Sequence, residues 1–403
     1  MLNLLERKKI TTITLELLIS LPFIWLFTGM YLTSGASRIL ITLTVISLIS
    51  YFIKQRKVTI PASVDHKWIV FLFFYCVLLT ISYLTYGASN GELRVSLSLL
   101  ALIIFIDRNT INFNFFSLLL FLGGLWSFSN AIYFHDQGRM AWPINPIQYA
   151  TYTASLCTLS LIIALKHTNT KVRFLSFMTI LLSGIATVMS DTRSAWIALL
   201  ITITLIFIYI YKKNKKTLLL CFLLFLPLTY LTSQTSLVQN RLHSTLLEIN
   251  KIKNDNLNTS IGLRFEIWKA GLYLFKDNPL LGVGKEYREP VKKLASAGLI
   301  IPQFKTFDMS SFHNDTLQTL VQYGIVGFTL FCLFFFYPAY RFFQNRSVEN
   351  LLCIAIFFIY FISGLSYVAI RENQTLGIFI VIIFILMDRK DFITTIPVII
   401  EDA

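Results

Sequence analysis

The chain has 403 residues, of which 55% are hydrophobic and only 14% are charged. Soluble domains carry about 25% charged residues, so this composition excludes a soluble globular protein. The formal net charge of +14 would suit a nucleic-acid-binding protein, but the positions of the basic residues give this charge another explanation.

The apolar residues are gathered into runs long enough to cross a bilayer. A helix needs about 20 apolar residues to span a hydrocarbon core of about 30 Å, and it satisfies its backbone hydrogen bonds internally. The sequence therefore predicts an all-α polytopic membrane protein. About twelve transmembrane helices are expected, in chain order at 11–32, 39–53, 68–85, 93–106, 113–134, 147–165, 173–190, 195–211, 217–232, 316–340, 350–370 and 375–388.

The connections between these helices alternate in basic content. One set, which includes both termini, holds most of the lysine and arginine residues. By the positive-inside rule both termini are predicted to be cytoplasmic, and the second set, called here the outer connections, faces the other side. The basic excess thus reports orientation, and no nucleic-acid partner is expected. Apart from their one long segment, the outer connections hold only five basic residues: Arg38, Arg94, Arg139, Arg193 and Arg371.

Residues 233–315 form the longest outer connection. Helix-like stretches occur at 245–253 and 263–276, and a turn-rich stretch follows at 278–284. Loops of this length without a function are uncommon in compact proteins, so we expect the chemistry here. The chain is accordingly divided into transmembrane helices one to nine (1–232), the outer loop with short helices (233–315), helices ten to twelve (316–388) and a cytoplasmic tail (389–403).

Two outer arginines are candidates for binding phosphate. Arg193 lies in a connection so short that it must sit at the membrane surface, where its planar guanidinium would suit phosphate oxygens. The alternative is an interfacial arginine that pairs with Asp191 or reaches lipid headgroups. Arg264 lies in a predicted amphipathic helix on the membrane surface. Its alternative role is that of a solvated neighbour of Glu266.

His313 is the candidate general base. It directly precedes the apolar run at 316–340, so its imidazole is expected at the outer membrane surface. There it could take a proton from an incoming sugar hydroxyl. The alternative is a histidine that is simply solvated in its loop.

Several other charged residues are weaker candidates. Arg139 and Arg288 could contact a sugar or lipid, although Arg288 lies in a charged cluster that could equally be solvated. Glu16 lies within the first span and is either functional or paired inside the bundle. Arg371 and Glu372 form either a local pair or a phosphate contact. No metal-site spacing or phosphate-binding loop occurs, so no metal or cofactor is expected.

Short motifs in a fixed order resemble those of a known family. They lie between 190 and 330, on the predicted outer side, while the resemblance in architecture covers essentially the whole chain. The motifs are Asp191-Thr192-Arg193-Ser194-Ala195-Trp196, then Gly262-Leu263-Arg264 with Trp268 and the stretch 278–284, and finally His313-Asn314-Asp315-Thr316-Leu317 followed by 323–327. With these motifs the chain resembles the O-antigen ligase and polymerase superfamily of bacterial envelope enzymes.

This resemblance implies a fold related to the GT-C glycosyltransferases, in the bacterial inner membrane with a periplasmic active site. The donor would be a glycan on undecaprenyl pyrophosphate, and no metal would be required. For a ligase, the acceptor would be a terminal sugar of lipid A–core, and the product would be lipopolysaccharide. By resemblance, Arg193 and Arg264 would bind the pyrophosphate, and His313 would orient or deprotonate the hydroxyl that attacks with inversion. Arg139 and Arg288 match no motif and stay candidate substrate-binding residues.

Several functions share these features. The single dominant outer loop favours an O-antigen ligase over an O-antigen polymerase, which would use a second lipid-linked glycan as acceptor. A protein-directed oligosaccharyltransferase would usually add a further outer domain. A transporter of lipid-linked oligosaccharide would bind the donor without chemistry, but the sequence lacks the internal repeats and paired broken helices typical of transporters.

Overall fold

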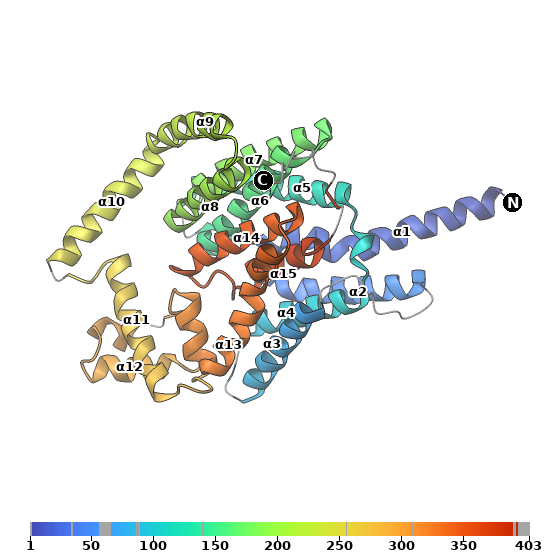
Figure 1. Cartoon of the computed structure of the whole chain (residues 1–403). Coiled ribbons are helices and arrows are strands. Elements are labelled where there is room, and N and C mark those ends of the chain that lie inside the picture. The colour runs from blue at the N-terminus through green and yellow to red at the C-terminus, as the bar shows by residue number, and fades with distance from the viewer. Residues whose placement is uncertain are drawn as a thin grey trace.

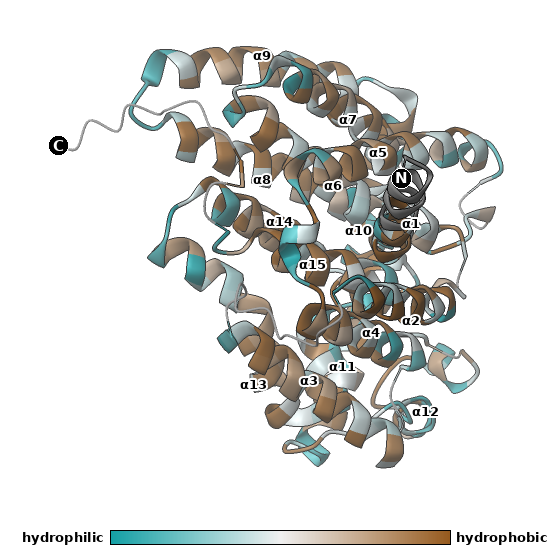
Figure 2. Cartoon of the chain, turned by 90° about the vertical axis from the view of Figure 1, so that its right-hand side faces the viewer, coloured by the Kyte–Doolittle hydropathy of each residue, from teal (hydrophilic) through white to brown (hydrophobic). Residues whose placement is uncertain are grey.

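The computed structural model describes residues 2–33, 35–55, 66–85, 87, 89–138, 141–254, 256–307, 309–389 and 392–393, with only the backbone for 2–12. Within these ranges the chain is helical and has no strand, as Figure 1 shows. The apolar residues extend along the helices of the bundle (Figure 2), and many large apolar side chains are exposed on its surface. The prediction of an all-α polytopic membrane protein is confirmed.

Twelve helices overlap the twelve predicted spans. Of these, all except α4, α14 and α15 belong to stretches that are long and apolar enough to cross a membrane. The bounds are α1 (Leu2–Phe27), α2 (Ala36–Gln55), α3 (His66–Thr85), α4 (Asn90–Phe105), α5 (Phe113–His135), α6 (Pro146–Lys166), α7 (Thr170–Met189), α8 (Arg193–Tyr211), α9 (Lys215–Ser233), α13 (Asp315–Gln344), α14 (Val348–Gly364) and α15 (Asn373–Leu386).

The shorter helices form part of the centre of the bundle. Helix α15 has 14 residues, and every residue from 374 to 386 is buried. Helix α14, with 17 residues, is also mostly buried. A helix that is surrounded by protein does not have to match the full hydrocarbon thickness. Helix α9 is the opposite case, because none of its residues is buried and its apolar side chains face outward.

Small and hydroxyl-bearing residues occur where α5, α6 and α7 pack together. Gly124 of α5 lies against Thr179 of α7, where a Cβ atom would come within 3.0 Å of a methyl group. Within α6, the hydroxyl groups of Thr151, Ser155 and Thr158 donate to backbone carbonyls four residues earlier. Small residues and satisfied hydroxyls are typical of helix contacts in membranes.

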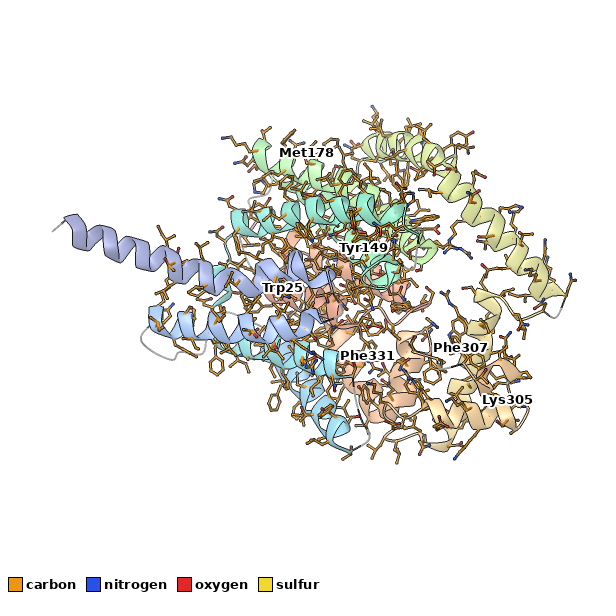
Figure 3. All side chains as sticks on the ribbon, turned by 180° about the vertical axis from the view of Figure 1, so that it is seen from behind. Trp25, Tyr149, Met178, Lys305, Phe307 and Phe331 are labelled. Atoms are coloured by element: carbon orange, nitrogen blue, oxygen red, sulfur yellow. The ribbon has the colours of Figure 1, made fainter. Side chains whose placement is uncertain are left out.

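The long outer connection folds as a separate layer beside the bundle. It contains α10 (Ser236–Lys253), α11 (Ser260–Asp277), α12 (Arg288–Ser296) and a short 3-10 helix (Pro302–Lys305). Helix α10 begins well before the stretch predicted from the sequence and runs from α9 towards α11 (Figure 1). Residues of α11, α12 and the start of α13 share a small core around Phe304 and Phe312. Figure 3 labels Lys305 and Phe307 in this layer, away from Trp25 and Tyr149 in the bundle.

Two of the sequence motifs meet where α13 is kinked at Gly324. The N–H of Val283 donates to the carbonyl of Val321 (2.8 Å), and the N–H of Ile325 donates to the carbonyl of Pro279 (2.8 Å). Gly324 has φ +61° and ψ −163°, a backbone region that is essentially restricted to glycine. A Cβ atom there would overlap the carbonyl of Leu280. The stretch 278–284 is therefore bonded directly into the interrupted helix.

The connections that were predicted to be cytoplasmic also contact one another. Arg341 pairs with Asp388 (2.7 Å), and Arg108 donates to the carbonyl of Met387 (2.8 Å). In the bundle, Glu16 pairs with Lys54 of α2 at 2.8 Å. Glu16 was expected to be either functional or paired inside the bundle, and the structure shows it paired.

Candidate active site

Arg193 is the first residue of α8, and its partner comes from the outer layer. Its Nη2 atom lies 2.8 Å from Oε1 of Glu248 on α10. The local alternative, a pair with Asp191, is not formed. Asp191 has φ +54° and its carboxylate pairs instead with Arg241 of α10 (2.9 Å). The α7–α8 turn and α10 are therefore joined by two ion pairs.

Arg264 lies in the first turns of α11, close to the same carboxylate. Helix α11 is capped by Thr259, whose hydroxyl accepts from the N–H of Gly262 (3.0 Å). The second oxygen of Glu248 accepts from the N–H of Ile261 (3.1 Å). Burial and the neighbouring charge of Arg193 lower the pKa of Arg264, while Glu248 opposes that shift.

Glu266 does not neutralise Arg264. Its carboxylate is buried and accepts from the N–H of Ile301 (2.9 Å). Arg264 and Glu266 therefore do not form a pair on a solvated face. No side chain in the described part of the chain forms a hydrogen bond or an ion pair with the Arg264 guanidinium. Two guanidinium groups thus lie near the single carboxylate of Glu248, which leaves positive charge available for an anion.

His313 is held in a strained turn just before α13. Its φ is +49°, in the left-handed region that only a few per cent of residues other than glycine adopt. The turn is fixed on one side by Trp268, which donates to the carbonyl of Phe312 (3.0 Å). On the other side, Asn314 caps α13 by accepting from the N–H of Leu317 (3.0 Å). Strain at such a position is commonly found at functional sites.

The electrostatics keep His313 neutral. Burial, and then the nearby charge of Arg264, lower the pKa of His313 to about 4. Its Nδ1 atom is buried and has no hydrogen-bond partner among the described residues. A neutral ring nitrogen can accept a hydrogen bond from a hydroxyl. Glu248 joins Arg193 to the start of α11, which carries Arg264. Trp268 joins α11 to the turn of His313, so the structure brings the three predicted residues into one region.

A cavity of about 770 Å³ opens beside His313. Outer connections from separate parts of the sequence line it, and Thr192 of the α7–α8 turn joins them by donating to the carbonyl of Pro146 (3.4 Å). The connections that were grouped as outer by their charge thus meet at one end of the bundle. The lining residues are Ser37, Ser89, Gly91, Arg94, Trp142, Pro143, Ile144, Asn145, Pro146, Ile147, Gln148, His313, Glu372, Asn373 and Gln374.

The carboxylate in this cavity belongs to a polar network that the sequence did not predict. Gln148 donates to the hydroxyl of Tyr367 (3.2 Å), which donates to Oε1 of Glu372 (3.2 Å). The Tyr367 ring lies beside the ring of His313, with the centroids 5.8 Å apart. Burial raises the pKa of Glu372 to about 7.

Arg371 points away from this network and does not pair with Glu372. Its guanidinium makes two hydrogen bonds to the carboxylate of Glu92 on α4, at 3.1 and 2.9 Å. Both side chains are buried. The Tyr323 ring lies under the guanidinium at 4.6 Å, and its hydroxyl donates to Glu92 at 3.4 Å. This buried pair ties α4 to the α14–α15 connection.

The remaining predicted residues lie outside this cluster or outside the described residues. Arg288 is the exposed first residue of α12, and no ion pair or hydrogen bond of its side chain occurs in the ranges that the structure covers. Arg139 lies outside the described residues. In the same ranges, no group of three or more His, Cys, Asp or Glu side chains could hold a metal ion.

The chain is similar to known proteins in the segment that holds these residues. Residues 178–332, which include Arg193, Arg264 and His313, match the family model of the O-antigen ligases. An uncharacterized protein of Haemophilus influenzae is 29% identical over 383 residues, which cover 90% of this chain and 93% of that protein.

A second relative carries a functional name. The O-antigen ligase of Escherichia coli strain K12 is 22% identical over 245 residues, 58% of this chain and 57% of that protein. Together with the family match, this relative confirms that the chain resembles the O-antigen ligase superfamily, as the motifs predicted.

Proposed function

We propose that this protein is an O-antigen ligase, a metal-independent inverting glycosyltransferase. It transfers a glycan from undecaprenyl pyrophosphate to a sugar hydroxyl of lipid A–core and thereby completes lipopolysaccharide. The observation that supports this most is the arrangement of Arg193 and Arg264 around one carboxylate, beside the neutral His313. This cluster lies within the segment that matches the O-antigen ligases.

The two arginines are proposed to bind the pyrophosphate leaving group. A carboxylate oxygen of Glu248 already lies 2.8 Å from Arg193, so an anionic oxygen fits that position. Fixed guanidinium groups stabilise the charge that develops on the leaving oxygen, and they do not need to reorganise during the reaction. Two such groups could offset much of the pyrophosphate charge without a metal ion.

His313 is proposed to bind the acceptor hydroxyl. A neutral imidazole with an unpartnered Nδ1 can accept the hydroxyl hydrogen bond, and so orient or deprotonate the nucleophile. The cavity beside it has the volume for a sugar. Arg288 is proposed to contact the glycan or the lipid from the outer layer. Arg139, which lies outside the described residues, is proposed as a second residue that contacts the glycan or the lipid. The orientation follows the loop charges, with both termini cytoplasmic and this site on the periplasmic face of the inner membrane.

Reconstitution tests the function directly. Purified protein is mixed with undecaprenyl-linked glycan and lipid A–core in the presence of a chelator. We expect glycan on the core. Longer lipid-linked glycan would identify a polymerase instead, movement of the donor across vesicles without product would identify a transporter, and a requirement for divalent metal would contradict the mechanism.

The site assignment is tested with variants in the same assay. His313→Ala and Arg193→Ala should each give folded protein in the membrane with no detectable transfer. The matched control is Arg38→Ala, because Arg38 is an exposed outer arginine on α2 that does not line the cavity. Wild-type transfer by either site variant would refute the assignment.

A further inference from the structure

The cavity beside His313 holds a half-buried carboxylate that the sequence motifs do not include. Glu372 immediately precedes α15, and the motifs end at residue 327. Its Oε1 atom accepts from the Tyr367 hydroxyl, and Tyr367 packs against His313. Glu372 and His313 therefore line the same cavity and are connected through one side chain.

The lining of the cavity suits a sugar. Hydroxyl and amide side chains predominate among its polar residues, and they can pair with hydroxyl groups as donors or acceptors. Gln374 is only 3% exposed, and its Oε1 atom has no partner in the described part of the chain. A buried acceptor without a partner is costly unless a ligand supplies a donor. Trp142 adds an aromatic surface to the same wall.

His313 is a weak proton acceptor in this environment. Protonation would place an imidazolium beside the charged Arg264, and the pKa of His313 is lowered to about 4. General bases work best when their pKa is close to the working pH. A nearby group with a pKa closer to neutral pH would accept the hydroxyl proton better than His313.

Glu372 is surrounded by groups that make it a better acceptor. Burial is the main reason that the pKa of Glu372 is raised to about 7, and the negative charge of Glu92 also raises this pKa. Tyr367, Gln148 and the charge of Arg371 oppose this shift. Two further titratable groups, Arg94 and His313, line the cavity.

We propose that this cavity is the acceptor-sugar subsite and that Glu372 is the base that takes the proton of the attacking hydroxyl. The inference rests on the proposed function. The acceptor oxygen forms a bond to the anomeric carbon of the donor, and the bond from that carbon to the pyrophosphate oxygen breaks. The electron pair of the broken bond leaves with the pyrophosphate held by Arg193 and Arg264. The hydroxyl proton passes to a carboxylate oxygen of Glu372, while His313 orients the hydroxyl.

The decisive variant is Glu372→Gln, which keeps the shape and the hydrogen-bond acceptor for Tyr367. We expect kcat to fall by about 10²- to 10⁴-fold, as is typical for loss of a general base, with the donor KM unchanged. Wild-type kcat should rise with pH through about 7, because the carboxylate must be ionised, and this rise should be absent in the variant. Glu372→Asp should recover part of the rate. The control is Glu289→Gln, an exposed glutamate of α12 that pairs with Lys292.

Several outcomes would overturn the inference. A normal rate in Glu372→Gln, or a reduced rate that keeps the rise near pH 7, would exclude Glu372 as the base. If the protein extends lipid-linked glycan instead of modifying the core, the ligase function fails, but the same comparison on that reaction still tests Glu372. Independently of turnover, the infrared difference between wild type and Glu372→Gln should contain a carboxyl band that titrates near pH 7. Its absence would contradict the inference.

Discussion

Glu248 lies where the proposed donor pyrophosphate would bind, so its removal should strengthen donor binding. The variant is Glu248→Gln. The amide oxygen can still accept from the N–H of Ile261 at the start of α11, a contact of 3.1 Å in the wild type. The amide NH2 group then faces Arg193, so the negative charge and the acceptor oxygen that lie 2.8 Å from that guanidinium are both lost.

The size of the effect follows from the geometry of this ion pair. At 2.8 Å and an effective dielectric constant of about 20, the Coulomb attraction is about 6 kcal/mol before desolvation. The side chains of Arg193 and Glu248 are 26% and 16% exposed, and exposed pairs contribute at most about 1 kcal/mol net. For this partly buried pair we therefore expect about 1–2 kcal/mol. A pyrophosphate that no longer has to displace it should bind about tenfold more tightly, since 1.4 kcal/mol corresponds to a factor of ten.

The assay is the Kd of inorganic pyrophosphate, and then of the lipid-linked donor, measured by calorimetry on purified protein. Glu289→Gln on α12 provides the control for a change of one charge. Arg193→Ala should weaken binding in the same titration. Unchanged or weaker pyrophosphate binding by Glu248→Gln would refute the reasoning, because Glu248 would then not compete for the anion site.

Two further predictions concern stability. Glu92→Gln removes the charge that neutralises the buried Arg371, and should lower the free energy of unfolding by about 3 kcal/mol or more, measured as thermal unfolding in detergent; an unchanged transition would contradict this. Gly324→Ala places a Cβ atom against the Leu280 carbonyl and requires an unfavourable backbone region, so it should cost at least about 2 kcal/mol. The control is Gly298→Ala, which has φ +73° and open space around it; equal losses in the two variants would show that the overlap is unimportant.

The helices could be predicted from the sequence because lipid imposes a simple rule. Each predicted span had to be a helix, and each overlaps one in the structure. Several connections that the alternation of basic residues placed in the outer set also line one cavity in the structure. Helix α10 was predicted too short, because the polar stretch from Ser236 to Ser244 lacks the apolar periodicity that identified the later part.

The partners of the charged residues could not be predicted, because they come from distant parts of the chain. Arg193 had a local candidate in Asp191, but its partner is Glu248, 55 residues away. Arg371 and Glu372 looked like a neighbouring pair. Instead Arg371 bonds to Glu92, 279 residues away, and Glu372 faces the cavity. Arg371 and Glu372 have different partners because α4, which carries Glu92, packs against α15.

No residue of α9 is buried, and this exposure affects how α9 responds to the membrane around it. Helix α9 has 19 residues and no buried side chain, and its length is about 28 Å. Its hydrophobic length therefore has to follow the local bilayer thickness, by tilting in thin membranes and standing upright in thicker ones. Because α9 leads directly into α10 (Figure 1), we expect a change in the tilt of α9 to move α10, which carries Glu248, the partner of Arg193. We therefore expect lipid composition to affect the anion site.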